Sequence, residues 1–321
     1  MKRFALLTLA ALFLFVGTGC KEKKASLPPR SVNIAIQPSA AFIPLYIARY
    51  KEYIEDELKP LNVTVVWQDF ESGPPMNQSL AAGLSDIGVI GDVPTVTALS
   101  AGNAMKLVGI PASGPDAYAM LARADDKSFK SSADMKGKKI ATVFGSTGHN
   151  FTTKLLEKNG LSFDQIEFIS ISAGEAANAL ESGVCDAIVI WEPNVTRLID
   201  SGAAKVVALG NETDLRGTNG FVVRSEYLAE NDDIIKVVLE QYHEAVRDIS
   251  SLDTPTLEKL SDALKITPEQ TKKIAQKYDF SVQISESDIT ALQDTASFLV
   301  EIGNMDSAFN VSEKAVNLIN P

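Results

Sequence analysis

Val143-Phe-Gly-Ser-Thr-Gly-His-Asn150 is the stretch on which the predicted fold depends. It follows an apolar strand pattern at 139–143 and precedes a helical pattern at 151–159 whose apolar side chains share one face. A strand that turns through Gly and Ser/Thr into a helix leaves backbone N–H groups without intrahelical partners, and the helix dipole adds positive charge there. We therefore predict a site for a small anion, although an ordinary capped helix start is the alternative. The candidate donors are Ser146, Thr147, Gly148 and His149.

Short apolar strands and helical patterns alternate on both sides of this stretch. Such alternation is typical of α/β lobes in which helices cover both faces of a parallel sheet. The first lobe is expected to hold strands at 32–36, 63–67, 87–90 and 106–110, with one mostly helical segment at 42–59. The second is expected to hold strands at 139–143, 167–170, 187–190 and 205–208.

Two connections between these lobes are predicted. A strand at 117–123 leaves the first lobe, and a strand at 220–224 can return to it. From residue 232 onward the chain reads as helices that pack mainly on lobe one. The fold class is thus two doubly wound α/β lobes joined by two crossover segments, with lobe one at 31–115 plus 225–321 and lobe two at 116–224.

Ligands of open α/β sheets bind at the carboxyl ends of the strands. The loops that follow the predicted strands from both lobes would converge there if the lobes close. From these loops we select four candidate ligand-binding residues: Gln37, Phe42, Ser72 and Trp191.

The first 30 residues read as targeting sequence. A basic start, an apolar run of thirteen residues from Phe4 to Val16 and small residues before Cys20 predict a secretory signal at 1–19. Small residues directly before a Cys resemble the bacterial lipobox, so Cys20 is the predicted lipidation site, and a plain signal peptide is the alternative. Residues 20–30 read as a polar tether, which places the protein outside the cytoplasm on a membrane anchor.

Composition excludes several functions. The formal charge of −11 argues against nucleic-acid binding, which needs a basic face. With only Cys20 and Cys185, a lipidated Cys20 leaves no disulfide, and Cys185 reads as a buried inert thiol. Two histidines, His149 and His243, exclude a multi-histidine metal site. The sequence contains no serine elbow, His-Glu-x-x-His helix or phosphate loop, so we predict no catalysis and no cofactor.

Several motifs, in preserved order, resemble the substrate-binding lipoproteins of bacterial ABC importers in the sulfonate/nitrate/taurine family. They are Phe70-Glu-Ser-Gly73, Leu80-Ala-Ala-Gly83, Asp86-Ile-Gly-Val-Ile-Gly-Asp-Val-Pro94, Gly137-Lys-Lys-Ile-Ala141, Gly145-Ser-Thr-Gly-His149, Ala187-Ile-Val-Ile-Trp-Glu-Pro193 and Phe221-Val-Val-Arg224. The resemblance spans roughly residues 32 to 250. It implies a two-lobed, periplasmic binding protein type II-like fold that closes on a small ligand and docks on a permease with its ATPase.

The resemblance also implies further site residues. Aliphatic sulfonate and taurine binders donate to the sulfonate from loops that here correspond to Ser146–His149 and to Gly91, Asp92 and Val93. Taurine binders place an acid near the position of Asn219, which is neutral here, so uncharged-tail sulfonates are favoured over taurine. Asp92 and Glu192 are the acids that could face an amine, although Asp92 is predicted to cap its helix. The expected ligand is a small anionic organosulfonate, and the expected protein is a monomer.

Other functions stay open at this point. Nitrate, or a pyrimidine or thiamine precursor stacked on Phe42, Phe70 or Trp191, is the alternative ligand. A two-lobed biosynthetic enzyme and a sensor lipoprotein are alternatives of a different class. The signal peptide argues against a cytosolic pathway enzyme.

Overall fold

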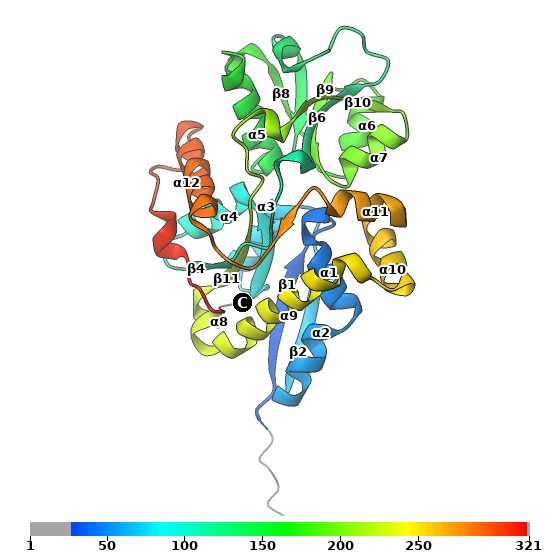
Figure 1. Cartoon of the computed structure of the whole chain (residues 1–321). Coiled ribbons are helices and arrows are strands. Elements are labelled where there is room, and N and C mark those ends of the chain that lie inside the picture. Colours follow the sequence, from blue (N-terminus) through cyan, green and yellow to red (C-terminus); the bar gives the residue numbers. More distant parts are fainter. Residues whose placement is uncertain (1–26, 320–321) are drawn as a thin grey trace, which may run out of the picture.

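The computed structural model describes residues 27–319 and has two lobes, one above the other (Figure 1). The predicted signal peptide, Cys20 and most of the tether lie outside the described residues. Within this range no helix combines the length and the apolar character that crossing a bilayer requires.

Strands and helices alternate as the sequence predicts. The strands are β1 (Arg30–Ile36), β2 (Val63–Asp69), β3 (Ile87–Gly91), β4 (Met105–Gly109), β5 (Ala112–Ser113), β6 (Tyr118–Arg123), β7 (Lys139–Thr142), β8 (Glu167–Ser170), β9 (Ala187–Trp191), β10 (Ala204–Leu209), β11 (Asn219–Arg224) and β12 (Asp279–Phe280). The helices are α1 (Ile43–Tyr50), α2 (Tyr53–Leu58), α3 (Gly73–Ala81), α4 (Asp92–Ser100), α5 (Thr147–Lys158), α6 (Ala176–Glu181), α7 (Asn194–Asp200), α8 (Ser225–Glu230), α9 (Asp232–Asp248), α10 (Thr254–Leu264), α11 (Pro268–Ala275) and α12 (Glu286–Glu301).

Each lobe is built on a five-stranded sheet, and the two sheets have the same strand pattern. The order is β2-β1-β3-β11-β4 in lobe one and, read from the matching edge, β8-β7-β9-β6-β10 in lobe two. The first three strands of each order are parallel, while β11 and β6 run antiparallel to both of their neighbours. The predicted two-lobed α/β class is confirmed, but the sheets are mixed and not wholly parallel.

The antiparallel strand of each sheet is the one that the chain enters on crossing from the other lobe. β6 follows the first crossing, and β11 follows the second and pairs with β3 and β4 of lobe one. The predicted boundary at residue 224 is therefore wrong, because β11 is part of the lobe-one sheet and lobe two ends before Asn219.

The central strands are buried on both faces. Every residue of β3 and of β9 is buried, which explains their continuous apolar sequences. The predicted mostly helical segment at 42–59 is confirmed as two helices, α1 and α2, separated where Glu52 adopts a left-handed conformation with φ 57°.

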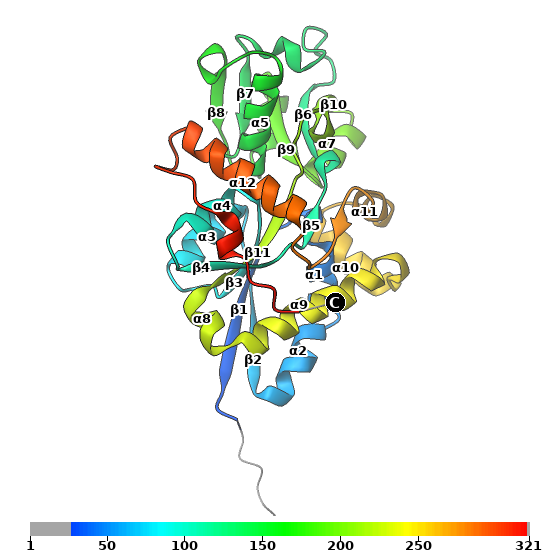
Figure 2. The ribbon, with the colours of Figure 1, turned by 60° about the vertical axis from the view of Figure 1, so that its left-hand side comes forward.

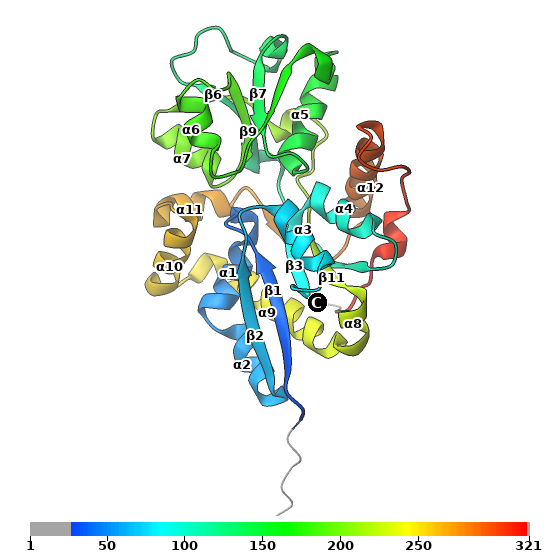
Figure 3. The ribbon, with the colours of Figure 1, turned by 180° about the vertical axis from the view of Figure 1, so that it is seen from behind.

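The C-terminal helices pack mainly on lobe one, as predicted. α9 and α10 lie against α1, and α12 lies against α4 (Figures 2 and 3). α12 also reaches lobe two, since the ring of Phe298 lies 5.7 Å from the ring of His149 and Thr295 Oγ1 lies 3.4 Å from Asn150 Nδ2.

A buried polar network holds the returning strand β11 in lobe one. Arg224 Nη2 donates to Asp86 Oδ1 at 2.7 Å, and Arg224 Nε donates to the carbonyl oxygen of Ser85 at 3.1 Å. Asp86 Oδ2 accepts from the backbone N–H of Asn33 at 2.8 Å. The Asp86 side chain is only 4% exposed, so its charge depends on these partners.

We predict that Arg224→Met lowers the free energy of unfolding by about 2–4 kcal/mol, because it leaves the Asp86 carboxylate buried without its cation. Denaturation in urea measures the change. Arg197→Met is the matched control, because Arg197 is exposed on α7. Equal losses in the two variants would contradict the role of the network.

Candidate functional site

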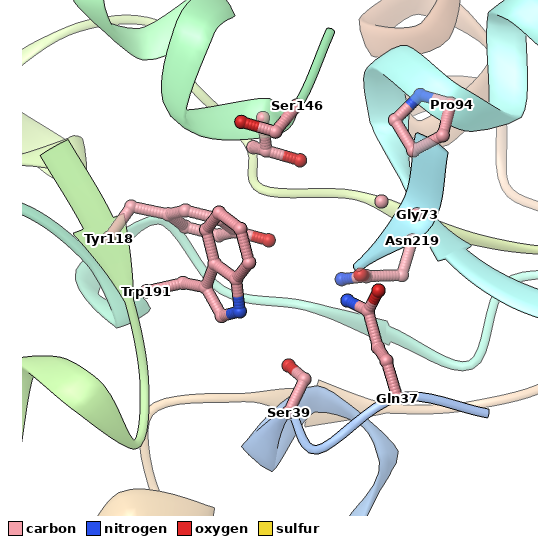
Figure 4. A pocket seen from close by; sticks show the side chains of 10 residues that line it. Gln37, Ser39, Gly73, Pro94, Tyr118, Ser146, Trp191 and Asn219 are labelled. Carbon is pink, nitrogen blue, oxygen red and sulfur yellow. The ribbon is translucent and has the colours of Figure 1, made fainter. Parts of the chain in front are cut away.

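A pocket lies between the lobes where the loops of both sheets meet (Figure 4). Its empty space is about 300 Å³, counting the part that is open to solvent. It is lined by Gln37, Ser39, Gly73, Gly91, Pro94, Tyr118, Ser146, Thr147, Trp191 and Asn219. Six of these residues were predicted from the sequence: Gln37, Gly91, Ser146, Thr147, Trp191 and Asn219.

All ten lining residues are uncharged. Their polar ends are hydroxyls, side-chain amides and an indole N–H, and Figure 4 shows those of Tyr118, Trp191, Gln37 and Asn219 pointing into the pocket. Because the whole chain has a formal charge of −11, an anion in this pocket would be held by short-range donors and not by the field of the protein.

The amino end of α5 forms one wall of the pocket. Ser146 caps the helix: its Oγ accepts from the N–H of His149 at 3.4 Å and donates to the carbonyl of Val143 at 2.7 Å. Because the Ser146 hydroxyl hydrogen is given to Val143, the donors left at this corner are the first N–H groups of α5 and the Thr147 hydroxyl. Gly145 has φ 71°, a left-handed conformation that suits glycine at this turn.

The two lobes approach each other closely beside these donors. A Cβ on Gly91, which ends β3 in lobe one, would lie 2.5 Å from Thr147 Oγ1 in lobe two. Glycine at position 91 therefore leaves room for the Thr147 hydroxyl and lets the two chain segments face the same small space.

Antiparallel strands supply two pocket residues from their amino ends. Tyr118 starts β6 and Asn219 starts β11, so both lie level with the carboxyl ends of the neighbouring parallel strands. Asn219 Nδ2 donates to the backbone oxygens of Ala112 and Gly217, at 3.3 and 3.1 Å. Burial raises the pKa of the Tyr118 hydroxyl, and the negative charge of Asp92 raises it further, so Tyr118 stays a neutral donor.

Gln37 and Trp191 face each other across the pocket (Figure 4). Gln37 is buried, and its side-chain oxygen has no hydrogen-bond partner within residues 27–319. A buried amide oxygen without a partner favours a hydrogen-bond donor in the pocket, from a bound water or a polar ligand.

Seven predicted ligand residues lie outside the pocket lining. They are Phe42, Ser72, Asp92, Val93, Gly148, His149 and Glu192. Phe42 and Val93 are buried in the hydrophobic cores, and Ser72 is the residue before α3. A Cβ on Gly148 would lie 2.5 Å from Thr142 Oγ1 and 3.1 Å from the carbonyl oxygen of Val189, so this glycine lets α5 pack closely on the sheet.

His149 points away from the pocket, into a group of aromatic rings. Its ring lies 4.9 Å from Phe144, 5.0 Å from Phe168 and 5.5 Å from Phe163. Burial lowers the pKa of His149 to about 4, so the imidazole is neutral at physiological pH. His149 does not line the interlobe pocket, and this geometry does not support the predicted hydrogen bond from His149 to the ligand.

Asp92 faces α5 and α12 instead of the pocket. Its Oδ1 accepts from the backbone N–H of Val93 at 2.7 Å, and its Oδ2 accepts from Asn150 Nδ2 at 2.8 Å. Burial raises the pKa of this carboxyl, and hydrogen bonds with the Thr147 hydroxyl and with Asn150 lower it. The predicted helix cap is wrong: α4 begins at Asp92 itself, and its N-cap is Gly91, which has no side chain to cap the helix. The Asp92 carboxylate instead bonds to Asn150 of the other lobe.

Glu192 is fully buried and links the lobes. Its Oε1 accepts from Lys277 Nζ of lobe one at 2.5 Å, and its Oε2 accepts from the backbone N–H of Thr196 at 3.0 Å. The carboxylate is thus occupied by its own lobe and by lobe one, away from the ligand space.

Hydrogen bonds across the outer edges of the cleft complete a closed arrangement. Glu71 Oε1 accepts from the backbone N–H of Gly174 at 2.9 Å, and Gln270 Nε2 donates to Asp200 Oδ2 at 2.6 Å. Each pair joins lobe one to lobe two, so the structure is that of the closed protein.

Four pocket residues were not selected from the sequence: Ser39, Gly73, Pro94 and Tyr118. Ser39 lies in the loop after β1, and Gly73 and Pro94 lie in the first turns of α3 and α4, directly after β2 and β3. Tyr118 carried no signal of a cleft position, because it begins a strand, and only the antiparallel direction of β6 brings it to the cleft.

Within residues 27–319 no group of three or more His, Cys, Asp or Glu side chains is placed to bind a metal ion. Cys185 is buried, as predicted, and burial raises the pKa of its thiol to about 11.

The chain matches a known protein family and is similar to several proteins named as binding proteins. Residues 39–251 match the protein family described as NMT1/THI5 like. A protein of Bacillus subtilis (strain 168), assigned provisionally to aliphatic sulfonate binding, is 29% identical over 323 residues, covering 99% of this chain and 95% of that protein. A similarly named protein of Escherichia coli (strain K12) is 30% identical over 246 residues, covering 76% of this chain and 74% of that protein.

Two further similarities concern function and fold. The taurine-binding periplasmic protein of Escherichia coli (strain K12) is 22% identical over 296 residues, covering 88% of this chain and 90% of that protein. The solved alkanesulfonate-binding protein SsuA from Xanthomonas axonopodis pv. citri, bound to MOPS, superimposes with a TM-score of 0.82 at 26% identity, covering 91% of this chain and 100% of that chain. All four proteins are named as binding proteins.

His149 gives a pH prediction. The pKa of His149 is about 4 in the folded protein and about 6.5 when exposed. Between these pH values the unfolded chain binds a proton at His149 and the folded protein does not. The stability that depends on a neutral His149 is therefore fully present above pH 6.5. It is lost as the pH falls toward 4, and the loss in unfolding free energy is at most about 3 kcal/mol.

Urea denaturation between pH 7 and 4 measures this contribution. The unfolding free energy of the unmodified protein should fall more steeply than that of His149→Gln. His243→Gln, which replaces the other histidine, on α9, is the control. Parallel profiles for the unmodified protein and His149→Gln would contradict the prediction.

Proposed function

The chain belongs to the NMT1/THI5-like family, and we propose that it is the solute-binding component of an ABC importer that captures a small organosulfonate between its lobes. The observation that carries this proposal is the interlobe pocket, where the amino end of α5 meets neutral donors from both lobes. The relatives are named as binding proteins, and we propose that this chain likewise releases its ligand unchanged.

A sulfonate suits this pocket for chemical reasons. Its single charge is spread over three oxygens that only accept hydrogen bonds, so several neutral donors can share it. The N–H groups at the start of α5 and the Thr147 hydroxyl come from lobe two, and the Gln37 amide comes from lobe one. Because a ligand would touch both lobes, it would bind the closed form more tightly and shift the protein toward it.

The tail of the ligand is proposed to be uncharged. The two acids that were candidates to face an amine, Asp92 and Glu192, are bonded to Asn150 and Lys277, and neither lines the pocket. Asn219, at the position that the resemblance links to the taurine amine, is neutral. An ammonium group in this pocket would lose water without gaining a carboxylate, which is costly.

The Trp191 and Tyr118 rings favour a second candidate ligand. Both side chains point into the pocket (Figure 4), and a flat heterocycle such as a pyrimidine precursor could stack on them. Such a ligand belongs to the alternative expected from the sequence, and the ligand panel below separates the two.

We further propose that the protein works outside the cytoplasm, as a monomer anchored by lipid at Cys20. The targeting pattern at 1–19 supports export, and a relative is named as periplasmic. Its partners would be the membrane permease and its ATPase. Mass spectrometry of the mature protein tests the anchor: an unmodified chain that retains Cys20 would refute it.

Calorimetric titration with propanesulfonate, nitrate and uracil tests the function. Binding of propanesulfonate to the purified protein is the expected result, and binding of uracil alone would favour the second candidate. If no anion bound at millimolar concentration, the sulfonate proposal would fail.

Thr147→Val should weaken propanesulfonate binding about tenfold, because it replaces a hydroxyl donor with a methyl of similar size. Thr97→Val makes the same change on α4 at an exposed position outside the pocket, and should leave the affinity unchanged. Equal affinities in the unmodified protein and Thr147→Val would remove this hydroxyl from the site.

Taurine should bind about tenfold or more weakly than ethanesulfonate, because its ammonium group finds no free carboxylate in the pocket. The two ligands differ only by that group, so paired titrations measure its cost directly. Tighter binding of taurine would mean that Asp92 or Glu192 leaves its present partner to face the amine.

A further inference from the structure

A second cavity lies on the far side of α5 from the interlobe pocket. Its empty space is about 960 Å³, counting the part that is open to solvent. Most of its lining comes from lobe two, and the end of α12 in lobe one supplies the rest, including Glu301 and Ile302. No residue of this cavity also lines the interlobe pocket.

The floor of the cavity is aromatic and uncharged. Phe144, Phe163 and Phe168 surround the ring of His149 at centroid distances of 4.9 to 5.5 Å. His149 Nδ1 accepts from the backbone N–H of Gly145 at 3.4 Å, so the proton of the neutral imidazole is on Nε2. Aromatic faces carry negative charge density, which attracts a cation.

The rim of the cavity is acidic. Glu157 comes from α5 and Glu301 comes from the end of α12, so one carboxylate belongs to each lobe. Neither lies within ion-pairing distance of a basic side chain in the part of the chain that the structure describes. Burial, and then the charge of Glu301, raise the pKa of the Glu157 carboxyl. A cation at the rim would relieve this repulsion.

Phe144 is exposed to 51%, unusual for a large apolar side chain beside a cavity. It lines the cavity together with Glu157 and Glu301. An apolar body in the cavity would cover this ring and gain the corresponding burial energy.

We propose that this cavity is a second ligand site, which binds a small organic ammonium ion with an aromatic or bulky apolar body. The apolar body lies among Phe144, Phe163 and Phe168, and the ammonium group lies toward Glu157 and Glu301. A carboxylate or sulfonate of the same shape is rejected, because the rim repels it. The site is independent of the sulfonate proposal, since it shares no lining residue with the interlobe pocket.

Benzylammonium is the probe, with benzyl alcohol as its neutral counterpart and phenylacetate as its anionic counterpart. Ligand-detected NMR and calorimetry are run on the full protein with and without saturating propanesulfonate. The expected order is benzylammonium, then benzyl alcohol, then phenylacetate, and propanesulfonate should not displace benzylammonium. Displacement would overturn the proposal, because it would place the cation in the interlobe pocket.

Two variants locate the site. Glu157→Gln with Glu301→Gln should reduce the preference for benzylammonium over benzyl alcohol at least threefold, because it removes the charge at the rim. Glu226→Gln is the control, since this side chain is 96% exposed on α8 of lobe one and does not line the cavity. Phe144→Ser should weaken both ligands, and its exposure makes loss of folding unexpected.

Three results would overturn the proposal. They are no binding of benzylammonium at millimolar concentration, an unchanged cation preference in the double glutamine variant, and an equal loss in Glu226→Gln. A protein that binds no sulfonate but shows the expected cation behaviour would contradict the function proposed above and leave this site standing.

Discussion

The interlobe pocket is lined by neutral groups within a chain of formal charge −11, and this electrostatic constraint governs the rest of the account. An anion approaches against the overall field, so it has to be held by hydrogen bonds and dipoles that act over a few ångströms. The amino end of α5 and the Thr147 hydroxyl are groups of that kind. The nearby acids are kept out by giving each one a partner: Asp92 bonds to Asn150, and Glu192 bonds to Lys277. Each of these bonds also joins the two lobes, so the groups that keep negative charge out of the pocket also stabilise closure.

Chain topology brings these neutral groups to the end of each sheet that faces the cleft. Each lobe receives one antiparallel strand from the chain as it crosses from the other lobe, β6 in lobe two and β11 in lobe one. Parallel strands present their carboxyl ends to the cleft, so an antiparallel neighbour presents its amino end there. Tyr118 and Asn219 occupy those two amino ends. The pocket therefore combines loops after parallel strands with the first residues of the two crossing strands.

Much of this was predictable from local sequence. The apolar runs of β3 and β9 and the Gly-Ser-Thr-Gly turn before α5 predict the strands, the two lobes and the Ser146–Thr147 corner, because these signals are local. The direction of β11 and β6 was not predictable, because it depends on pairing between distant segments, and this is why Tyr118 was missed and the lobe boundary was placed at residue 224. The orientations of His149 and Glu192 were also beyond the sequence. His149 is the third residue of α5 and packs against aromatic rings, while the partner of Glu192 is 85 residues away.

The amino end of α5 presents backbone donors to the neutral pocket, while His149, in the same first turn, faces an aromatic cavity with an acidic rim. The central claim is that neutral donors, not charged side chains, hold the anion, and its most direct test is the affinity for propanesulfonate measured by calorimetry from about 0.02 to about 0.5 M sodium chloride. Neutral donors in a negatively charged protein predict an affinity that stays nearly constant or rises slightly, because salt screens only the repulsion. A fall of tenfold or more over that range would contradict the account, since it would show that a positively charged side chain pairs with the ligand.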